Sequence, residues 1–137
     1  MEDSQRLMAE RACERLVTQF CDYVDSFRHE DLVGLWAEDA EWITWQGPVQ
    51  GHDAIRAYLA AKPQTGTSLH VVQNVTIDVD DPENARGRAV FLYFGSGEDA
   101  ASALVPQVIG RYDDRYRLTS DGWKFARRDT EIVFSAG

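Results

Sequence analysis

The chain has 137 residues, of which 44% are hydrophobic and 27% are charged, a composition that fits one globular domain and excludes intrinsic disorder. Its formal net charge of −9 argues against a nucleic-acid partner, because such proteins present a basic surface to the phosphates. We find no secretory apolar run near the start and no stretch of about 18 apolar residues that would span a membrane. We therefore expect a single cytoplasmic domain, residues 1–137, without a membrane partner.

The first half of the chain predicts three helices. Between residues 5 and 27, apolar side chains recur at steps of three and four, which is typical of an amphipathic helix with one buried face. A short second helix is expected over residues 30–37. A β-branched and aromatic strand should follow over residues 40–45, and Gln46-Gly47-Pro48 should break it. A third helix is predicted over residues 52–62.

After Thr67 the hydrophobic period changes to two, which indicates β-strands. Four long strands with short links are expected, at residues 68–79, 85–94, 105–118 and 123–134. Consecutive strands with short connections form antiparallel pairs, and helices that precede a block of strands indicate an α+β fold. We therefore predict helices packed on one face of a bent antiparallel sheet.

Histidine is the residue type that draws attention to a possible site. The sequence has no phosphate-binding glycine loop, no zinc-type cysteine pairs and no nucleophile elbow, and its three histidines lack metal-ligand spacing. We therefore expect neither a metal nor a cofactor. His70 lies near the start of a strand among apolar neighbours, where an imidazole needs a partner. It is either a core histidine bonded to a backbone carbonyl or the partner of a buried carboxylate.

Asp25 is the candidate carboxylate. The helical period places it on the flank of the first helix's apolar stripe, so periodicity alone does not bury it. A solvated aspartate near a helix end is the alternative.

Several motifs occur in a characteristic order along the chain: Tyr23-Val24-Asp25-Ser26-Phe27, Asp31-Leu32, Leu35-Trp36-Ala37-Glu38-Asp39-Ala40-Glu41-Trp42, Gly51, Ile55, His70, Asn74, Tyr112, Tyr116 and Asp121-Gly122-Trp123-Lys124-Phe125. In this order they resemble the SnoaL-like branch of the nuclear transport factor 2-like superfamily over nearly the whole chain. Within it, the resemblance is greatest to the group of scytalone dehydratase and hexachlorocyclohexane dehydrochlorinase. It implies a cone-shaped α+β barrel in which a curved antiparallel sheet wraps around three N-terminal helices and encloses a pocket.

The resemblance also implies catalytic residues. Members of that group carry an Asp on the first helix and a His on the following long strand, and Asp25 and His70 fall on those positions. Asp25 would hold His70 in one tautomer, so that the other ring nitrogen removes a proton from a substrate carbon. The matching arginine is Arg128, which would assist a leaving group or an oxyanion. An ion pair between Arg128 and Asp114 or Asp129 is the alternative.

The expected pocket is apolar, and its substrate-binding residues are Phe20, Trp42, Tyr112 and Ile132. Phe20 stands where the dehydrochlorinase has a functional lysine, and residues 105–107 lack the second histidine of scytalone dehydratase. Ketosteroid isomerase keeps its base where this chain has Thr44. We therefore expect a substrate different from theirs.

These features predict a cofactor-independent lyase, a dehydratase or a dehydrohalogenase-like enzyme, that acts on a small hydrophobic or cyclic molecule. One alternative is a non-catalytic small-molecule-binding or subunit-type protein of the same fold. Another is a polyketide cyclase or a ketosteroid-isomerase-like isomerase, in which Tyr58, Tyr93 or Tyr112 would donate to a carbonyl. The resemblance further implies a homo-oligomer, with a trimer favoured over a dimer, packed through the sheet surface and residues 132–134.

Overall fold

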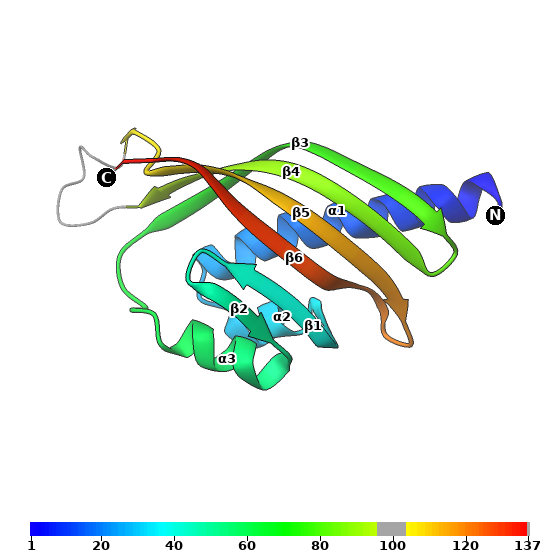
Figure 1. Cartoon of the computed structure of the whole chain (residues 1–137), viewed down its shortest axis with the longest axis horizontal. Coiled ribbons are helices and arrows are strands. Elements are labelled where there is room, and N and C mark those ends of the chain that lie inside the picture. Colours follow the sequence, from blue (N-terminus) through cyan, green and yellow to red (C-terminus); the bar gives the residue numbers. More distant parts are fainter. Residues whose placement is uncertain (96–103, 137) are drawn as a thin grey trace.

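The computed structural model describes residues 1–95 and 104–136, and these form three α-helices and six strands (Figure 1). In chain order the elements are α1 (Asp3–Asp25), α2 (His29–Val33), β1 (Trp36–Thr44), β2 (Gly47–Gln50), α3 (His52–Ala60), β3 (Ser68–Asp81), β4 (Asn84–Gly95), β5 (Val108–Thr119) and β6 (Gly122–Ser135). The predicted α+β class is confirmed. The connection between β4 and β5 includes residues 96–103, which lie outside the described part.

The six strands form one curved sheet in the order β2-β1-β6-β5-β4-β3. The four long strands pair antiparallel as predicted, but β1 runs parallel to β6, with Trp42 opposite Arg128. The expectation of a wholly antiparallel sheet is therefore wrong, and the sheet is mixed. The first and last strands of this chain meet without a connecting turn, so no local pattern specifies their relative direction.

The second helix ends earlier than predicted. The helix α2 ends at Val33, and Trp36 and Ala37 already belong to β1. The backbone explains the difference, because Trp36 pairs with Phe125 in β6 and the Phe125 N–H donates to the Leu35 carbonyl. Pairing with a distant strand thus overrides the local helical pattern.

The strand β2 is absent from the prediction. The strand is broken as predicted, but the turn consists of residues 45 and 46, and the chain pairs back on β1 from Gly47 onward, with Val49 opposite Trp42. Pro48 argues against a strand, since proline cannot donate to a neighbour. It is tolerated because β2 is an edge strand.

The helix α1 runs along one side of the curved layer formed by β3 to β6, while the β1–β2 hairpin groups with α2 and α3 (Figure 1). The predicted apolar face of α1 is confirmed as far as Cys21, with six buried side chains: Ala9, Cys13, Leu16, Val17, Phe20 and Cys21. The prediction is wrong at its end, because α1 stops at Asp25 and Phe27 is exposed beyond it. Burial of each larger apolar side chain contributes about 1.5–3 kcal/mol, so this stripe fixes the helix on the sheet. In the described residues, no helix has the length and apolar character needed to cross a membrane.

Candidate active site

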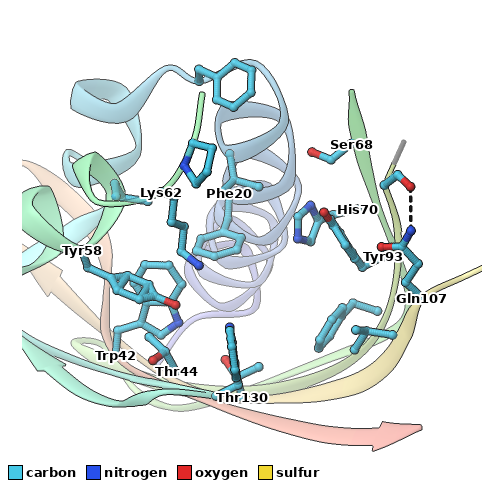
Figure 2. Close-up of a pocket in the computed structure, with 18 of the residues that line it drawn as sticks. Phe20, Trp42, Thr44, Tyr58, Lys62, Ser68, His70, Tyr93, Gln107 and Thr130 are labelled. Carbon is cyan, nitrogen blue, oxygen red and sulfur yellow. Dashed lines mark hydrogen bonds between the residues drawn. The ribbon is translucent and has the colours of Figure 1, made fainter. Parts of the chain in front are cut away.

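A cavity of about 570 Å³ opens between the end of α1, the α3–β3 connection and the concave side of the sheet. Its volume suits a small organic molecule. The residues that we predicted to bind substrate all line it: Phe20, Trp42, Tyr112 and Ile132. Figure 2 shows Phe20 at the back of the cavity, between Tyr58 on one wall and His70 on the other.

Aromatic rings form the floor of this cavity. The Phe20 ring packs edge-on against Trp42 and Tyr112, with centroid separations of 5.5 and 5.9 Å, and all three side chains are buried. Such edge-to-face pairs are favourable because the positive edge of one ring meets the negative face of another. Ile132 is partly exposed at the outer part of the cavity. The floor is therefore closely packed and apolar.

Asp25 and His70 are brought together by the end of α1 and the start of β3. Asp25 Oδ1 lies 2.6 Å from His70 Nδ1, and Asp25 Oδ2 accepts the backbone N–H of His70 at 2.7 Å. The Ser68 hydroxyl also donates to Asp25 Oδ1, at 2.9 Å. Ser68 and His70 share one face of β3 because side chains alternate along a strand. Three hydrogen bonds therefore fix the carboxylate, which is not the solvated aspartate of the alternative interpretation.

This contact sets the tautomer of the imidazole. A carboxylate oxygen only accepts hydrogen bonds, so Nδ1 of His70 carries the proton that it donates to Asp25. Nε2 is then the nitrogen with a free lone pair. His70 lines the cavity and Asp25 lies behind it, so the arrangement presents one basic nitrogen of defined orientation to a ligand.

The wall beside His70 consists of two aromatic residues of β4. The Tyr93 ring lies 5.0 Å from the imidazole, and Phe91 stacks on Tyr112 at 4.4 Å. Gly110 makes this stacking possible, because a Cβ atom at that position would lie 2.5 Å from the Phe91 ring. The backbone of β5 can therefore approach the Phe91 ring closely at Gly110, and this contact fixes the position of Phe91 in the wall.

Arg128 departs from the prediction. It belongs to the same strand face as Thr130 and Ile132, which line the cavity, but it is not itself a lining residue. Its guanidinium forms two hydrogen bonds to Asp114, from Nε at 2.8 Å and from Nη2 at 2.9 Å. The expected contact with a leaving group is corrected: the observed arrangement is the ion pair with Asp114 that we considered as the alternative.

The Arg128–Asp114 pair lies beneath the aromatic floor. The guanidinium carbon is 3.6 Å from the Tyr112 ring centroid and 4.4 Å from that of Phe20, so both rings cover it. Burial lowers the pKa of Arg128, but the Asp114 carboxylate outweighs this effect and holds the pKa above its ordinary value. Arg128 is therefore a permanent cation under the floor and no proton donor.

Two residues that line the cavity each carry a buried polar atom without a partner within the described residues: the indole nitrogen Trp42 Nε1 and the hydroxyl Thr130 Oγ1. Trp36 Nε1 and Arg128 Nη1 are also buried without a partner there, but their residues do not line the cavity. A buried polar group without a partner is unfavourable by about 1–3 kcal/mol. As the side chains stand, both atoms are closed off from the cavity, so each is an unpaired polar group inside the wall.

Sequence reasoning missed several lining residues. The alternation of β4 and β3 could have identified Phe91 and Ser68, because they share strand faces with Tyr93 and His70. His29 and Lys62 had no such signal, since both are placed by turns at helix ends. Within residues 1–95 and 104–136, no three side chains of metal-ligating type come together.

Comparison with solved structures defines the fold class. An NTF2-like protein with a cystatin-like fold from Novosphingobium aromaticivorans superposes with a TM-score of 0.82 at 22% identity, over 96% of this chain and 87% of that chain. The chain therefore has the same cystatin-like fold as that protein.

The family follows from the sequence match. The SnoaL-like domain matches residues 5–129, and the chain belongs to this family, as predicted. A scytalone dehydratase-like protein from Novosphingobium aromaticivorans is 24% identical, with a TM-score of 0.84 over 98% of this chain and 91% of that chain. Hexachlorocyclohexane dehydrochlorinase LinA-type3 from Novosphingobium barchaimii is 18% identical, with a TM-score of 0.82 over 98% and 93%. No curated protein matches the chain.

Proposed function

We propose that the protein is a cofactor-independent lyase, in which His70 removes a proton from carbon in a small cyclic substrate and a leaving group departs. The observation that supports this most is the 2.6 Å contact between His70 Nδ1 and Asp25 Oδ1 at the wall of a cavity with an aromatic floor. Structural similarity to dehydratase-like and dehydrochlorinase proteins supports the same chemistry.

The proposed reaction is an elimination. Nε2 of His70 takes the proton from a substrate C–H, and the electron pair of that bond becomes the second bond of a new C=C. The neighbouring carbon loses its leaving group together with the bonding electrons, as halide or as hydroxide. Asp25 stabilises the imidazolium while it exists, because its carboxylate already accepts the Nδ1 proton. When the leaving group is hydroxide, His70 returns the proton to it and water is released.

The leaving group needs donors, and the cavity wall offers them. Trp42 Nε1 and Thr130 Oγ1 have no partner within the described part of the chain, and both residues line the cavity. Rotation of either side chain would turn its donor toward the cavity, where a hydrogen bond would stabilise the negative charge that develops on the leaving group. In this proposal Arg128 is a positioning residue, which holds the rings of Phe20 and Tyr112 from below.

An isomerase is less well supported, because the position of its base is occupied by a structural residue. Thr44 lines the cavity, but its hydroxyl donates to the Gly47 carbonyl at 2.8 Å and accepts the Gln46 N–H at 3.1 Å. These two hydrogen bonds stabilise the β1–β2 turn. His70 is therefore a better candidate for the proton acceptor than any group of β1.

The experiment is a screen of elimination substrates, namely small cyclic alcohols and halides, followed through the ultraviolet absorption of the new double bond. His70→Gln should lower kcat/KM by about 10²–10⁴-fold, the range for loss of a general base. His52→Gln is the matched control, because His52 bonds the Trp36 carbonyl and does not line this cavity; it should retain the rate. An unchanged rate in His70→Gln, or binding of these compounds without turnover by the wild type, would overturn the proposal.

We also propose a homo-oligomer, with a trimer favoured over a dimer. Apolar side chains are exposed on the strands of the sheet, among them Leu69, Val71 and Phe134. Exposed apolar surface of this kind is typical of protein interfaces. Light scattering should give a particle mass of three times the chain mass of 15.5 kDa. Phe134→Glu should reduce the particle mass to that of a single chain. A monomeric wild type would contradict this assembly.

A further inference from the structure

The charge of the cavity lining is opposite to that of the whole chain. The chain has 23 acidic and 14 basic residues, apart from histidine, and a formal net charge of −9. None of the described residues that line the cavity is acidic, and one of them, Lys62, is a lysine. A surface of this composition is mainly acidic. A lining without acidic residues and with one ammonium group therefore indicates that the cavity prefers a negatively charged ligand.

Lys62 is held toward the cavity by its neighbours. It follows the end of α3, where its backbone N–H donates to the Leu59 carbonyl at 3.2 Å. Its Nζ lies 4.5 Å from the ring centroid of Tyr58 and 6.0 Å from that of Trp45, and both aromatic residues line the cavity. Cation–π contacts of this kind fix an ammonium group without neutralising it. Of the ion pairs in the described part of the chain, none involves Lys62.

The two walls of the cavity differ in electrostatic character. Figure 2 shows Lys62 on the wall of Tyr58, and His70 with Tyr93 on the opposite wall. Asp25 lies behind His70 and brings a negative charge to that side. An anionic group would be repelled from the Asp25 side and attracted to Lys62. The neutral part of the same molecule would then face the imidazole.

We propose that Lys62 determines specificity by binding an anionic oxygen group of the substrate, a carboxylate or a phenolate. The substrate is then a small cyclic organic anion that is held at one end by Lys62 and presents a carbon at the other end to His70. The orientation toward His70 rests on the proposed function, whereas the binding of an anion by Lys62 stands without it.

Binding of matched probes tests this inference without turnover. Calorimetric titration of 2-naphthoate and its neutral isostere 2-naphthamide compares a carboxylate with an uncharged group of the same shape. The wild type should bind the carboxylate about fivefold more tightly at low salt, as expected for one incompletely shielded charge pair. Lys62→Met should abolish the preference, and Lys62→Arg should preserve it. Titration with 4-nitrophenolate in alkaline buffer tests the phenolate form, and the tighter of the two anions identifies the substrate group.

The chain offers a matched control for the charge. It contains two lysines, and the other one, Lys124, bonds the Gly34 carbonyl outside this cavity. Lys124→Met changes the net charge equally and should keep the preference for the anion. A wild type that binds the amide as tightly as the carboxylate, binding of neither anion, or a preference that survives in Lys62→Met would overturn the inference. The titrations measure binding and do not depend on turnover. The lyase proposal can therefore fail in the His70→Gln experiment while the preference for the anion holds, and the reverse.

Discussion

Two carboxylates in this protein each hold a nitrogen base, yet the two pairs have different surroundings. Asp114 and Arg128 are buried under aromatic rings, with side-chain exposures of 1% and 0%. Asp25 and His70 retain 13% and 18%, and the imidazole lines the cavity. A guanidinium only donates hydrogen bonds, whereas a neutral imidazole also has a nitrogen that can accept a proton. The sealed pair therefore serves the fold, and the pair at the cavity is suited to chemistry.

The largest effect should come from breaking the sealed pair. Arg128→Met leaves the Asp114 carboxylate buried without its cation, and we expect a loss of about 3–5 kcal/mol in the free energy of unfolding, measured with urea. The double variant Asp114→Leu with Arg128→Met removes both charges and should recover most of that loss. A single variant with wild-type stability would contradict a structural role for this pair.

Asp25→Asn should change the chemistry more than the fold. The side-chain NH2 of the introduced asparagine would donate to Nδ1 of His70, so the proton moves to Nε2 and the lone pair no longer faces the cavity. We expect kcat to fall by about 10²-fold or more and the unfolding free energy by about 1–2 kcal/mol. Nitrogen NMR of the imidazole reports the tautomer directly. Asp22→Asn, at an exposed position of the same helix, is the control; an unchanged tautomer in Asp25→Asn would refute this explanation.

The smallest effect concerns the free thiols of α1, which lie close to the two pairs. Burial raises the pKa of Cys13 to about 12 and that of Cys21 to about 11. Above the ordinary thiol pKa, the unfolded chain releases protons that the folded chain keeps, so stability declines as the pH rises. Between pH 8 and 9, where the decline begins, it should be about 0.5 kcal/mol for each thiol. Urea midpoints from neutral to alkaline pH measure it, and a thiol-free Cys13→Ala/Cys21→Ala variant should show a flatter profile. Equal profiles would contradict this assignment.

Local patterns predicted the elements that bury one face. The three- and four-residue steps of α1 and the alternation of β3 to β6 are properties of short segments, so the sequence alone reveals them. The parallel pairing of β1 with β6 depends on residues far apart in the chain, such as Trp42 and Arg128. The same pairing ends α2 early by drawing Trp36 into β1.

The site was predictable to a similar extent. Periodicity left Asp25 on the flank of its helix, and only the family resemblance connected it with His70. The alternation of β6 groups Arg128 with Thr130 and Ile132 but does not say which face is the inner one or how deep a side chain lies, and Phe20 and Tyr112 cover the guanidinium. Lys62 depends on how the chain leaves α3, which no periodic pattern describes.

The link between α3 and β3 supplies a large part of the cavity rim within six consecutive positions: Lys62, Pro63, Gln64, Thr65 and Thr67. These positions are exposed or half-exposed and lie outside the helix and the aromatic floor. Replacement of a few neighbouring codons can therefore alter which molecules enter, while the imidazole and its carboxylate stay in place. Such a separation between entrance and reaction centre allows relatives to diverge in the compounds they accept without rebuilding their interior.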